Sequence, residues 1–261
     1  MTWILLLGGL IAGLLSGLLG IGGGSIMVPL LVSQGFAPVA AVGTSTLTIA
    51  LIAISGTVQN ARMGYFDWRK VLGLGVPSIF TAQLGAYLAN RLPAANLLFA
   101  FGVMLLVNIY LMYLRRQLIT QIGVAGPQDA IESQQQQGIG KMSIRLLTGG
   151  AAGLLAGLFG VGGGIIMVPL QVLFLAEPIK TAIQTSLGVI IMTAIAASLG
   201  HFWAGSVVVS AGLLLAVGGI IAAQASARLL PRLGDRAVMV LFNGLILILA
   251  GYTFYQAGQM S

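Results

Sequence analysis

Hydrophobic residues occupy this chain in long runs, and polar residues gather in short stretches between the runs. The runs are apolar throughout rather than along one stripe, which is typical of helices surrounded by lipid. A bilayer core about 30 Å thick needs roughly 20 apolar residues per helical span. The runs of sufficient length are Val39–Gln59, Val71–Ala89, Ala94–Leu114, Thr181–Leu199, Ser206–Leu230 and Ala237–Phe254. The pattern therefore predicts an all-α polytopic membrane protein.

Two further apolar segments are interrupted by glycine and nearly repeat each other. Gly13–Leu31 reads GLLSGLLGIGGGSIMVPLL, and Gly153–Gln171 reads GLLAGLFGVGGGIIMVPLQ, with fourteen of nineteen positions identical at an offset of 140. The duplication continues at an offset of 141, where Thr44–Ser45 matches Thr185–Ser186. We therefore expect two homologous repeats, each a glycine-broken helix pair followed by three transmembrane helices.

The repeats predict a first transmembrane unit over residues 1–114 and a second over residues 143–261. The intervening residues 115–142 contain GPQDAIESQQQQGIGK, which is polar and rich in glutamine. Such a composition favours a flexible linker over a folded domain. The first residues, MTWILLLGGL, lack the basic start and the cleavage site of a signal peptide, so we expect them to be part of the fold.

The distribution of basic residues favours one topology. If both glycine-broken segments cross the membrane completely, the twelve Lys and Arg residues divide seven to five between the two sides. If each segment instead enters and returns as a hairpin of two half-helices, only Arg91 lies outside and eleven lie inside. Cytoplasmic loops carry the excess of basic residues. We therefore expect hairpins, periplasmic termini, a cytoplasmic linker and two repeats inserted in inverted orientations.

Composition narrows the function classes. The chain is 58% hydrophobic and 7% charged, with a mean hydropathy of +1.03. It has no cysteine and one histidine, which argues against disulfides and against a metal cage. Its five acids lie in loops or at the ends of runs, which argues against a carboxylate proton relay at mid-membrane. The net charge of +7 fits loops that face anionic lipid better than nucleic acid. We expect the bilayer as a partner, and no nucleic acid, metal or cofactor.

The two glycine breaks are the first candidate site. Successive glycines weaken a helix and permit backbone with positive φ. The first N–H groups of the helix that follows have no partner within it, and a helix N-terminus favours anions by about 0.3–2 kcal/mol. Two such N-termini from inverted repeats would converge near the middle of the membrane. The residues expected to bind a small anion there are Gly22, Gly23, Gly24, Ser25, Gly162, Gly163 and Gly164.

Polar side chains inside the spans are the second candidates. They recur in both repeats and can donate to an anion or tie helices together. They are Thr44, Ser45, Gln83, Thr185, Ser186 and Gln224. Close helix packing is the preferred interpretation of the remaining glycines of the motif, which are Gly13, Gly17, Gly153 and Gly157.

His201 is a separate candidate, because it matches Asn60 of the first repeat and lies near the end of a span. A histidine titrates near neutral pH and can couple transport to protons. A polar anchor near the membrane surface is the more common role of a single histidine in such a place.

Taken together, these motifs resemble the TauE/SafE family of membrane transporters, also called the sulfite exporter family. The resemblance rests on the doubled glycine motif, on Gly-Thr-Ser at Gly43–Ser45, on the turn Gly64–Trp68 and on the segment Gln83–Ala86. It implies export or uptake of sulfite, organosulfonates or related sulfur-containing or carboxylate anions across the bacterial inner membrane. The second repeat departs from the pattern, since Gln184 replaces the glycine of Gly-Thr-Ser.

Other functions stay open from the sequence. An integral-membrane enzyme is disfavoured, because no nucleophile or metal constellation is visible. A non-transporting assembly partner and a passive anion channel are the remaining alternatives to alternating access. The substrate, the transport direction, the coupling ion and the formation of a homo-oligomer are not fixed by these patterns.

Overall fold

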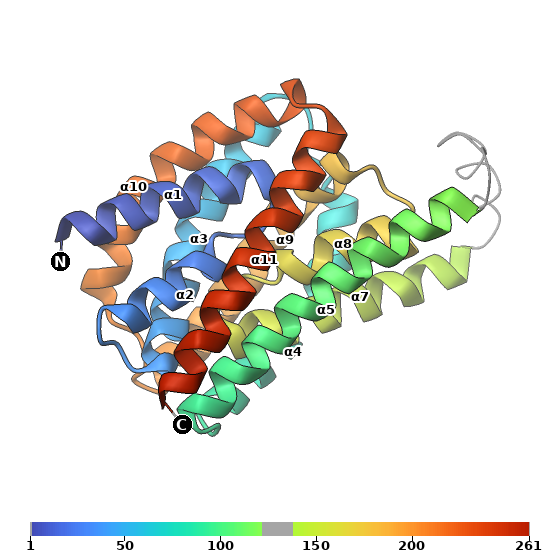
Figure 1. Cartoon of the computed structure of the whole chain (residues 1–261). Coiled ribbons are helices and arrows are strands. Elements are labelled where there is room, and N and C mark those ends of the chain that lie inside the picture. Colours follow the sequence, from blue (N-terminus) through green and yellow to red (C-terminus); the bar gives the residue numbers. More distant parts are fainter. Residues whose placement is uncertain (1, 122–137, 261) are drawn as a thin grey trace.

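The computed structural model describes residues 2–121 and 138–260, and within these ranges the regular elements are all helices (Figure 1). The helices are α1 (Thr2–Leu19), α2 (Gly24–Ser33), α3 (Pro38–Arg62), α4 (Trp68–Ala89), α5 (Ala94–Gln121), α7 (Gly138–Phe159), α8 (Gly164–Phe174), α9 (Ile179–Trp203), α10 (Val209–Leu229), the 3₁₀ turn η1 (Leu230–Arg232) and α11 (Asp235–Met260). Seven of the described helices are long and apolar enough to cross a membrane. The prediction of an all-α polytopic membrane protein is confirmed at this level.

The predicted spans correspond to α3, α4, α5, α9, α10 and α11, and each glycine segment is divided into a long and a short helix. The helices reach into both ends of the segment expected to be a linker, since α5 continues to Gln121 and α7 begins at Gly138. Residues 115–121 contain no glycine or proline that would end α5. Residues 122–137, the rest of that expected linker, lie outside the described residues.

The two halves interlock. Helix α1 of the first half lies along α10 of the second (Figure 1), and α7 of the second half lies along α4 of the first. Helix α3 packs against α9, and α5 packs against α11. Each half therefore buries much of its surface against the other.

Glycines permit the closest of these helix contacts. A Cβ on Gly13 or Gly17 would collide with the backbone of α10, and a Cβ on Gly153 or Gly157 would collide with the backbone of α4. Small residues let transmembrane helices approach in this way. The structure therefore supports the interpretation of these four glycines as sites of close helix packing.

One end of the molecule, here called the basic end, gathers most of the described cations. The Lys70 Nζ lies 2.8 Å from the Glu177 Oε1, and the Lys180 Nζ lies 3.4 Å from the Asp235 Oδ1. The Arg145 side chain packs against the first turns of α4. These contacts bring the starts of α4, α7, α9 and α11 to the same end. The basic residues near this end are Arg62, Arg69, Lys70, Arg145, Lys180, Arg228, Arg232 and Arg236.

The short helices return toward the ends from which their partners start. Arg145, early in α7, and Glu177, just after α8, both lie at the basic end near α4. Helix α2 points away from it, because the Gln256 Nε2 near the far end of α11 donates to the Pro29 O at 3.1 Å. Arg91 follows the far end of α4, opposite the basic end.

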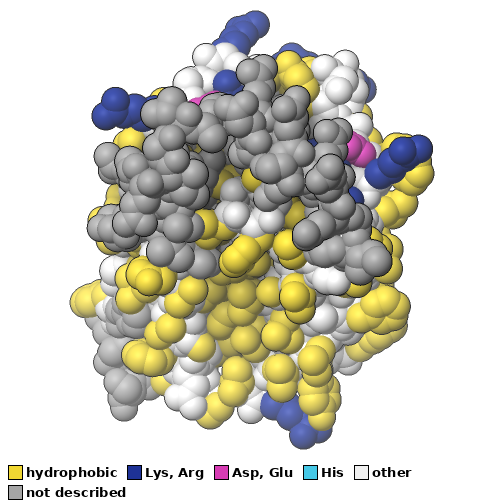
Figure 2. All heavy atoms as spheres, turned by 90° about the vertical axis from the view of Figure 1, so that its right-hand side faces the viewer, with side chains coloured by type: hydrophobic (Ala, Val, Ile, Leu, Met, Phe, Trp, Pro, Cys, Tyr) yellow, Lys and Arg dark blue, Asp and Glu magenta, His cyan; other side chains and the backbone are white. Residues whose placement is uncertain are grey.

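The outer surface carries large exposed hydrophobic side chains. Trp3, Phe80, Leu147, Trp203 and Ile248 are between 71% and 79% exposed. Figure 2 shows a broad hydrophobic area with Lys and Arg side chains toward its upper and lower edges. Apolar surface of this extent is stable against lipid rather than water. The surface therefore agrees with a multi-pass membrane protein.

Candidate functional site

Both glycine breaks adopt a backbone that other residues rarely take. Three glycines in each break have a positive φ, between 64° and 81°. They are Gly20, Gly22, Gly23, Gly160, Gly162 and Gly163. L-residues pay a steric cost in this region, whereas glycine does not. The expectation of positive φ at the breaks is confirmed, and it explains why several glycines occur together.

The two breaks cross each other inside the protein. A Cβ placed on Gly24 would collide with the Gly160 carbonyl, and one placed on Gly164 would collide with the Gly20 carbonyl. The same imagined Cβ on Gly24 would lie 2.7 Å from the Val161 Cα. The backbones of the two halves therefore touch, and we call this contact the crossing.

Two serines join the halves at the crossing. The Ser45 Oγ donates to the Gly160 O at 2.6 Å, and the Ser186 Oγ donates to the Gly20 O at 3.0 Å. The two serines are matched positions of the repeats, so the two bonds are reciprocal. Each hydroxyl also lies 2.8 Å from a carbonyl one turn earlier in its own helix. Both serines are fully buried.

Two isoleucines close the crossing. Ile49 and Ile190 are matched positions near the middle of the 25-residue helices α3 and α9. Their side chains pack against Gly22 and Gly162, and both are 0% exposed. The crossing therefore lies at mid-helix depth and is covered by apolar side chains in this conformation.

Each short helix starts at the crossing without a side-chain cap. Gly23 precedes α2 and Gly163 precedes α8, and neither can supply a capping side chain. Ser25, the second residue of α2, is 1% exposed, and its hydroxyl has no hydrogen-bond partner among the described residues. A buried hydroxyl without a partner is costly, and such groups are rare. Ser25 is therefore the described side chain at the crossing with unused hydrogen-bonding capacity.

Thr193 was not predicted from the sequence. Its Oγ1 donates to the Gly162 O at 3.1 Å and also lies near two carbonyls of its own helix. The matched position in the first repeat is Ile52, so recurrence between the repeats, the signal that identified the other candidates, was lacking here.

Two of the other predicted side chains make contacts between helices. The Gln83 Nε2 donates to the Ala196 O at 2.6 Å and joins α4 to α9. The Thr44 Oγ1 accepts from the backbone N–H of Val208 at 3.0 Å, at the start of α10. Thr185 is buried beside Ser186, and Gln224 is half-buried in α10. The structure thus brings Ser45 and Ser186 to the glycine breaks, whereas the contacts described for Gln83 and Thr44 lie elsewhere.

His201 is buried in a small polar network at the end of α9 that lies away from the basic end. Its Nε2 lies 2.8 Å from the Gly157 O, and its Nδ1 lies 3.1 Å from the Asn90 Nδ2. The Asn90 Oδ1 accepts in turn from the Ser206 hydroxyl. A carbonyl on one side and an amide donor on the other assign the ring proton to Nε2. The matched Asn60 is also fully buried, and both of its amide atoms lack a partner among the described residues.

Comparison with known proteins agrees with the motifs. The family model "Sulfite exporter TauE/SafE" matches residues 5–253. The "Probable membrane transporter protein YunE" of Bacillus subtilis is 28% identical over 272 residues, which cover 99% of this chain and 98% of that protein. A "Probable membrane transporter protein" of Xylella fastidiosa is 30% identical over 187 residues, which cover 69% of this chain and 66% of that protein. No solved structure matches the chain.

Proposed function

Because the chain belongs to the sulfite exporter TauE/SafE family of membrane transporters, we propose that it carries a small anion across the bacterial inner membrane by alternating access. The substrate class is sulfite, an organosulfonate or a related sulfur-containing or carboxylate anion. The observation that carries this proposal is the crossing, where two glycine-broken helices meet at mid-helix depth. Paired broken helices in corresponding halves are a common place for a transport site.

The chemistry of the crossing suits an anion. The starts of α2 and α8 supply backbone N–H groups and the positive ends of two helix dipoles. The glycines proposed to bind through these groups are Gly22, Gly23, Gly24, Gly162, Gly163 and Gly164. The Ser25 hydroxyl adds a buried donor without a partner. Ser45 and Ser186 can rotate their hydroxyls from the carbonyls to the anion.

The placement of the two serine bonds supports the proposal of alternating access. Helix α9 starts at the basic end, so the Ser186–Gly20 bond lies on the basic side of the crossing. Helix α3 ends at the basic end, so the Ser45–Gly160 bond lies on the opposite side. In the proposed cycle, opening toward the basic end breaks the first bond and opening toward the other end breaks the second.

The orientation in the membrane is part of the proposal. Cytoplasmic loops are enriched in Lys and Arg, so the basic end is assigned to the cytoplasm together with residues 115–142. The hairpins α1–α2 and α7–α8 open at opposite ends of the molecule, which supports two inverted repeats. Ile49 and Ile190 block the crossing in the described conformation, which favours alternating access over a permanently open channel.

The test is anion binding to the purified protein, measured as a thermal shift with sulfite, thiosulfate, sulfoacetate, taurine, sulfate, acetate and chloride. We expect stabilisation by one class of these anions. Ser25→Ala should lower the affinity of the protein for that anion about tenfold, because a hydrogen bond to a charged group is worth roughly 1.5 kcal/mol or more.

Ser16→Ala is the matched control. Ser16 is also buried, and its hydroxyl also lacks a described partner, but it lies in α1 before the break. The matched residue in the second repeat is Ala156, so an alanine already occupies the equivalent position of this fold. An equal loss of anion affinity in both variants would mean that Ser25 does not bind the anion. The absence of stabilisation by every anion would contradict anion transport and favour an assembly role.

A further inference from the structure

An ion pair joins the two halves at the basic end. The Lys70 Nζ, from the start of α4, lies 2.8 Å from the Glu177 Oε1, just after α8. The Glu177 side chain is 10% exposed and the Lys70 side chain is 28% exposed. A pair this shielded is screened less by salt than a surface pair. It therefore holds α4 of the first half to the α8–α9 turn of the second.

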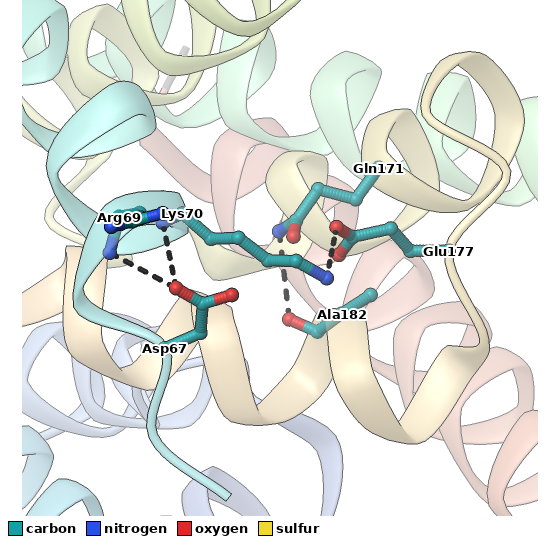
Figure 3. Close-up of polar contacts among 6 residues, drawn as sticks. All are labelled: Asp67, Arg69, Lys70, Gln171, Glu177 and Ala182. Carbon is teal, nitrogen blue, oxygen red and sulfur yellow. Dashed lines mark hydrogen bonds and ion pairs between the residues drawn. The ribbon is translucent and has the colours of Figure 1, made fainter. Parts of the chain in front are cut away.

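A buried amide residue, Gln171, is joined to Glu177 through the backbone. Figure 3 shows the Lys70 ammonium at the Glu177 carboxylate and the Gln171 amide directed at the Ala182 carbonyl. Gln171 is 0% exposed, and its Nε2 lies 3.5 Å from the Ala182 O. The Gln171 Oε1 and the Glu177 Oε2 are both buried without a partner among the described residues. Both atoms accept hydrogen bonds, so each can take a donor that the described residues do not supply.

The backbone turns Glu177 inward at a strained position. Ala176 has a φ of 51°, and it is the described non-glycine residue with a positive φ. The Glu177 N–H then donates back to the Gln171 O at 3.3 Å. Strained backbone of this kind persists where the surrounding structure holds it, and it clusters at functional sites.

The first half has the same backbone turn, in which the Phe36 N–H donates to the Leu31 O at 3.1 Å, but it lacks the charged and amide side chains. Its matched turn has Gly35 in place of Ala176, and α2 is one residue shorter than α8. This extra residue accounts for the change of the repeat offset from 140 to 141. The residues matched to Gln171, Glu177 and Lys70 are Leu31, Phe36 and Ala211. The fold therefore forms this turn without charged residues, and the second half has acquired them.

Helix α8 connects the ion pair to the crossing. Gly164 at its start touches the Gly20 carbonyl, and Gln171 lies two turns further along the same helix. In the proposed cycle, a movement of α8 at the crossing would displace the Glu177 carboxylate from Lys70, because Glu177 lies just after this helix.

The charged groups around the pair are mostly basic. Arg69 follows the Asp67 cap of α4, Lys180 begins α9, and Arg145 of α7 packs against α4. The Asp67 carboxylate accepts from the backbone N–H groups of Arg69 and Lys70 (Figure 3). Lys180 forms an ion pair with Asp235. The side chains of Arg115, Arg116 and Lys141 lie outside the described residues. The surroundings thus attract anions to Lys70.

We propose that Glu177, Lys70 and Gln171 form a proton-coupled anion latch at the basic end. An anion binds the Lys70 ammonium and displaces the Glu177 carboxylate from it. The released Glu177 carboxylate takes one proton from the aqueous phase, and its new O–H donates to the Gln171 Oε1. One anion and one proton enter together, so the net charge of the site is unchanged. This latch rests on the proposed anion transport and names the proton as its coupling ion.

The test measures proton uptake when an anion binds. Purified full-length protein in weak buffer near pH 7 is titrated with methanesulfonate and with thiosulfate, which stay ionised, while a pH dye reports protons. We expect up to one proton taken up per anion bound. Glu177→Gln should abolish proton uptake and keep anion-induced thermal stabilisation, because the amide releases Lys70 without a proton.

Two further variants sharpen the test. Asp235→Asn breaks the exposed Lys180 pair at the same end and should leave proton uptake unchanged. Gln171→Leu, which introduces the residue of the matched position, should keep anion binding but reduce proton uptake at pH 7. The reason is that the protonated carboxyl then lacks its acceptor.

The outcomes separate this latch from the proposed function. Anion binding without proton uptake in the unaltered protein, or equal uptake by Glu177→Gln, would overturn the latch and leave anion transport standing. Failure of every anion to bind would overturn the proposed function. The proton site is then tested without anion by the infrared band of a protonated carboxyl on acidification. Its presence in Glu177→Gln at unchanged intensity would overturn the latch.

Discussion

Single glycines at the crossing differ in what they do. Gly22 needs its positive φ, whereas Gly24 has an ordinary helical backbone and needs only the absence of a Cβ. Gly205 has a φ of 70° but open space around an added Cβ. These three positions separate backbone strain from close contact between the halves.

A pair of substitutions tests this separation. Gly205→Ala should cost about 1 kcal/mol, which is the usual strain of a non-glycine residue in the left-handed region. Gly24→Ala should cost several times more, because its Cβ would collide with the Gly160 carbonyl and the Val161 backbone. Thermal unfolding of the detergent-solubilised protein measures both. Equal destabilisation would mean that the halves do not touch at Gly24.

At the scale of helices, the sequence predicted the breaks but not all of their surroundings. The doubled GGG motif indicated two half-helices per repeat, because glycine both weakens helix and permits positive φ. That prediction was wrong for α1 and α7, which are long and apolar enough to cross a membrane, so only α2 and α8 are short. The meeting of Ser45 with Gly160 depends on how α3 packs against the other half, and repetition only marked Ser45 as a candidate. Glu177 was correctly expected at the end of a span. Its burial was not, since burial depends on the turn at Ala176 and on Lys70 from a distant helix.

The reciprocal serine bonds lead to a prediction about helix movement. Ser186→Ala should favour opening toward the basic end, and Ser45→Ala should favour opening toward the other end. The expected shift is roughly three- to twentyfold, since hydrogen bonds between membrane helices are worth about 0.6–1.7 kcal/mol.

The measurement uses the absence of cysteine in the chain. Ile190→Cys introduces a single thiol at the crossing, and an impermeant maleimide is applied from one side of sealed vesicles at a time. Faster labelling from the same side in both serine variants would contradict the assignment of the two bonds to opposite sides of the crossing.

At the scale of the whole molecule, interlocking of the halves governs stability. The long contact faces of α1 and α7 lie against α10 and α4, so each half alone would leave its glycine-lined surfaces uncovered. We expect fragments 1–129 and 130–261 to be unstable when made separately and to assemble when made together. Co-purification of the two fragments measures this. A folded, monodisperse fragment obtained alone would contradict it.

The reciprocity of the crossing has a consequence for the origin of the chain. Ser45 bonds Gly160 and Ser186 bonds Gly20, so residue i of one repeat meets residue j of the other, and j meets i. That is the arrangement of an isologous interface between two identical subunits. A single ancestral repeat could have buried its glycine break only by pairing with a copy of itself. One polypeptide thus contains the kind of interface that two identical subunits would form, and the Lys70–Glu177 pair is an asymmetry between its two repeats.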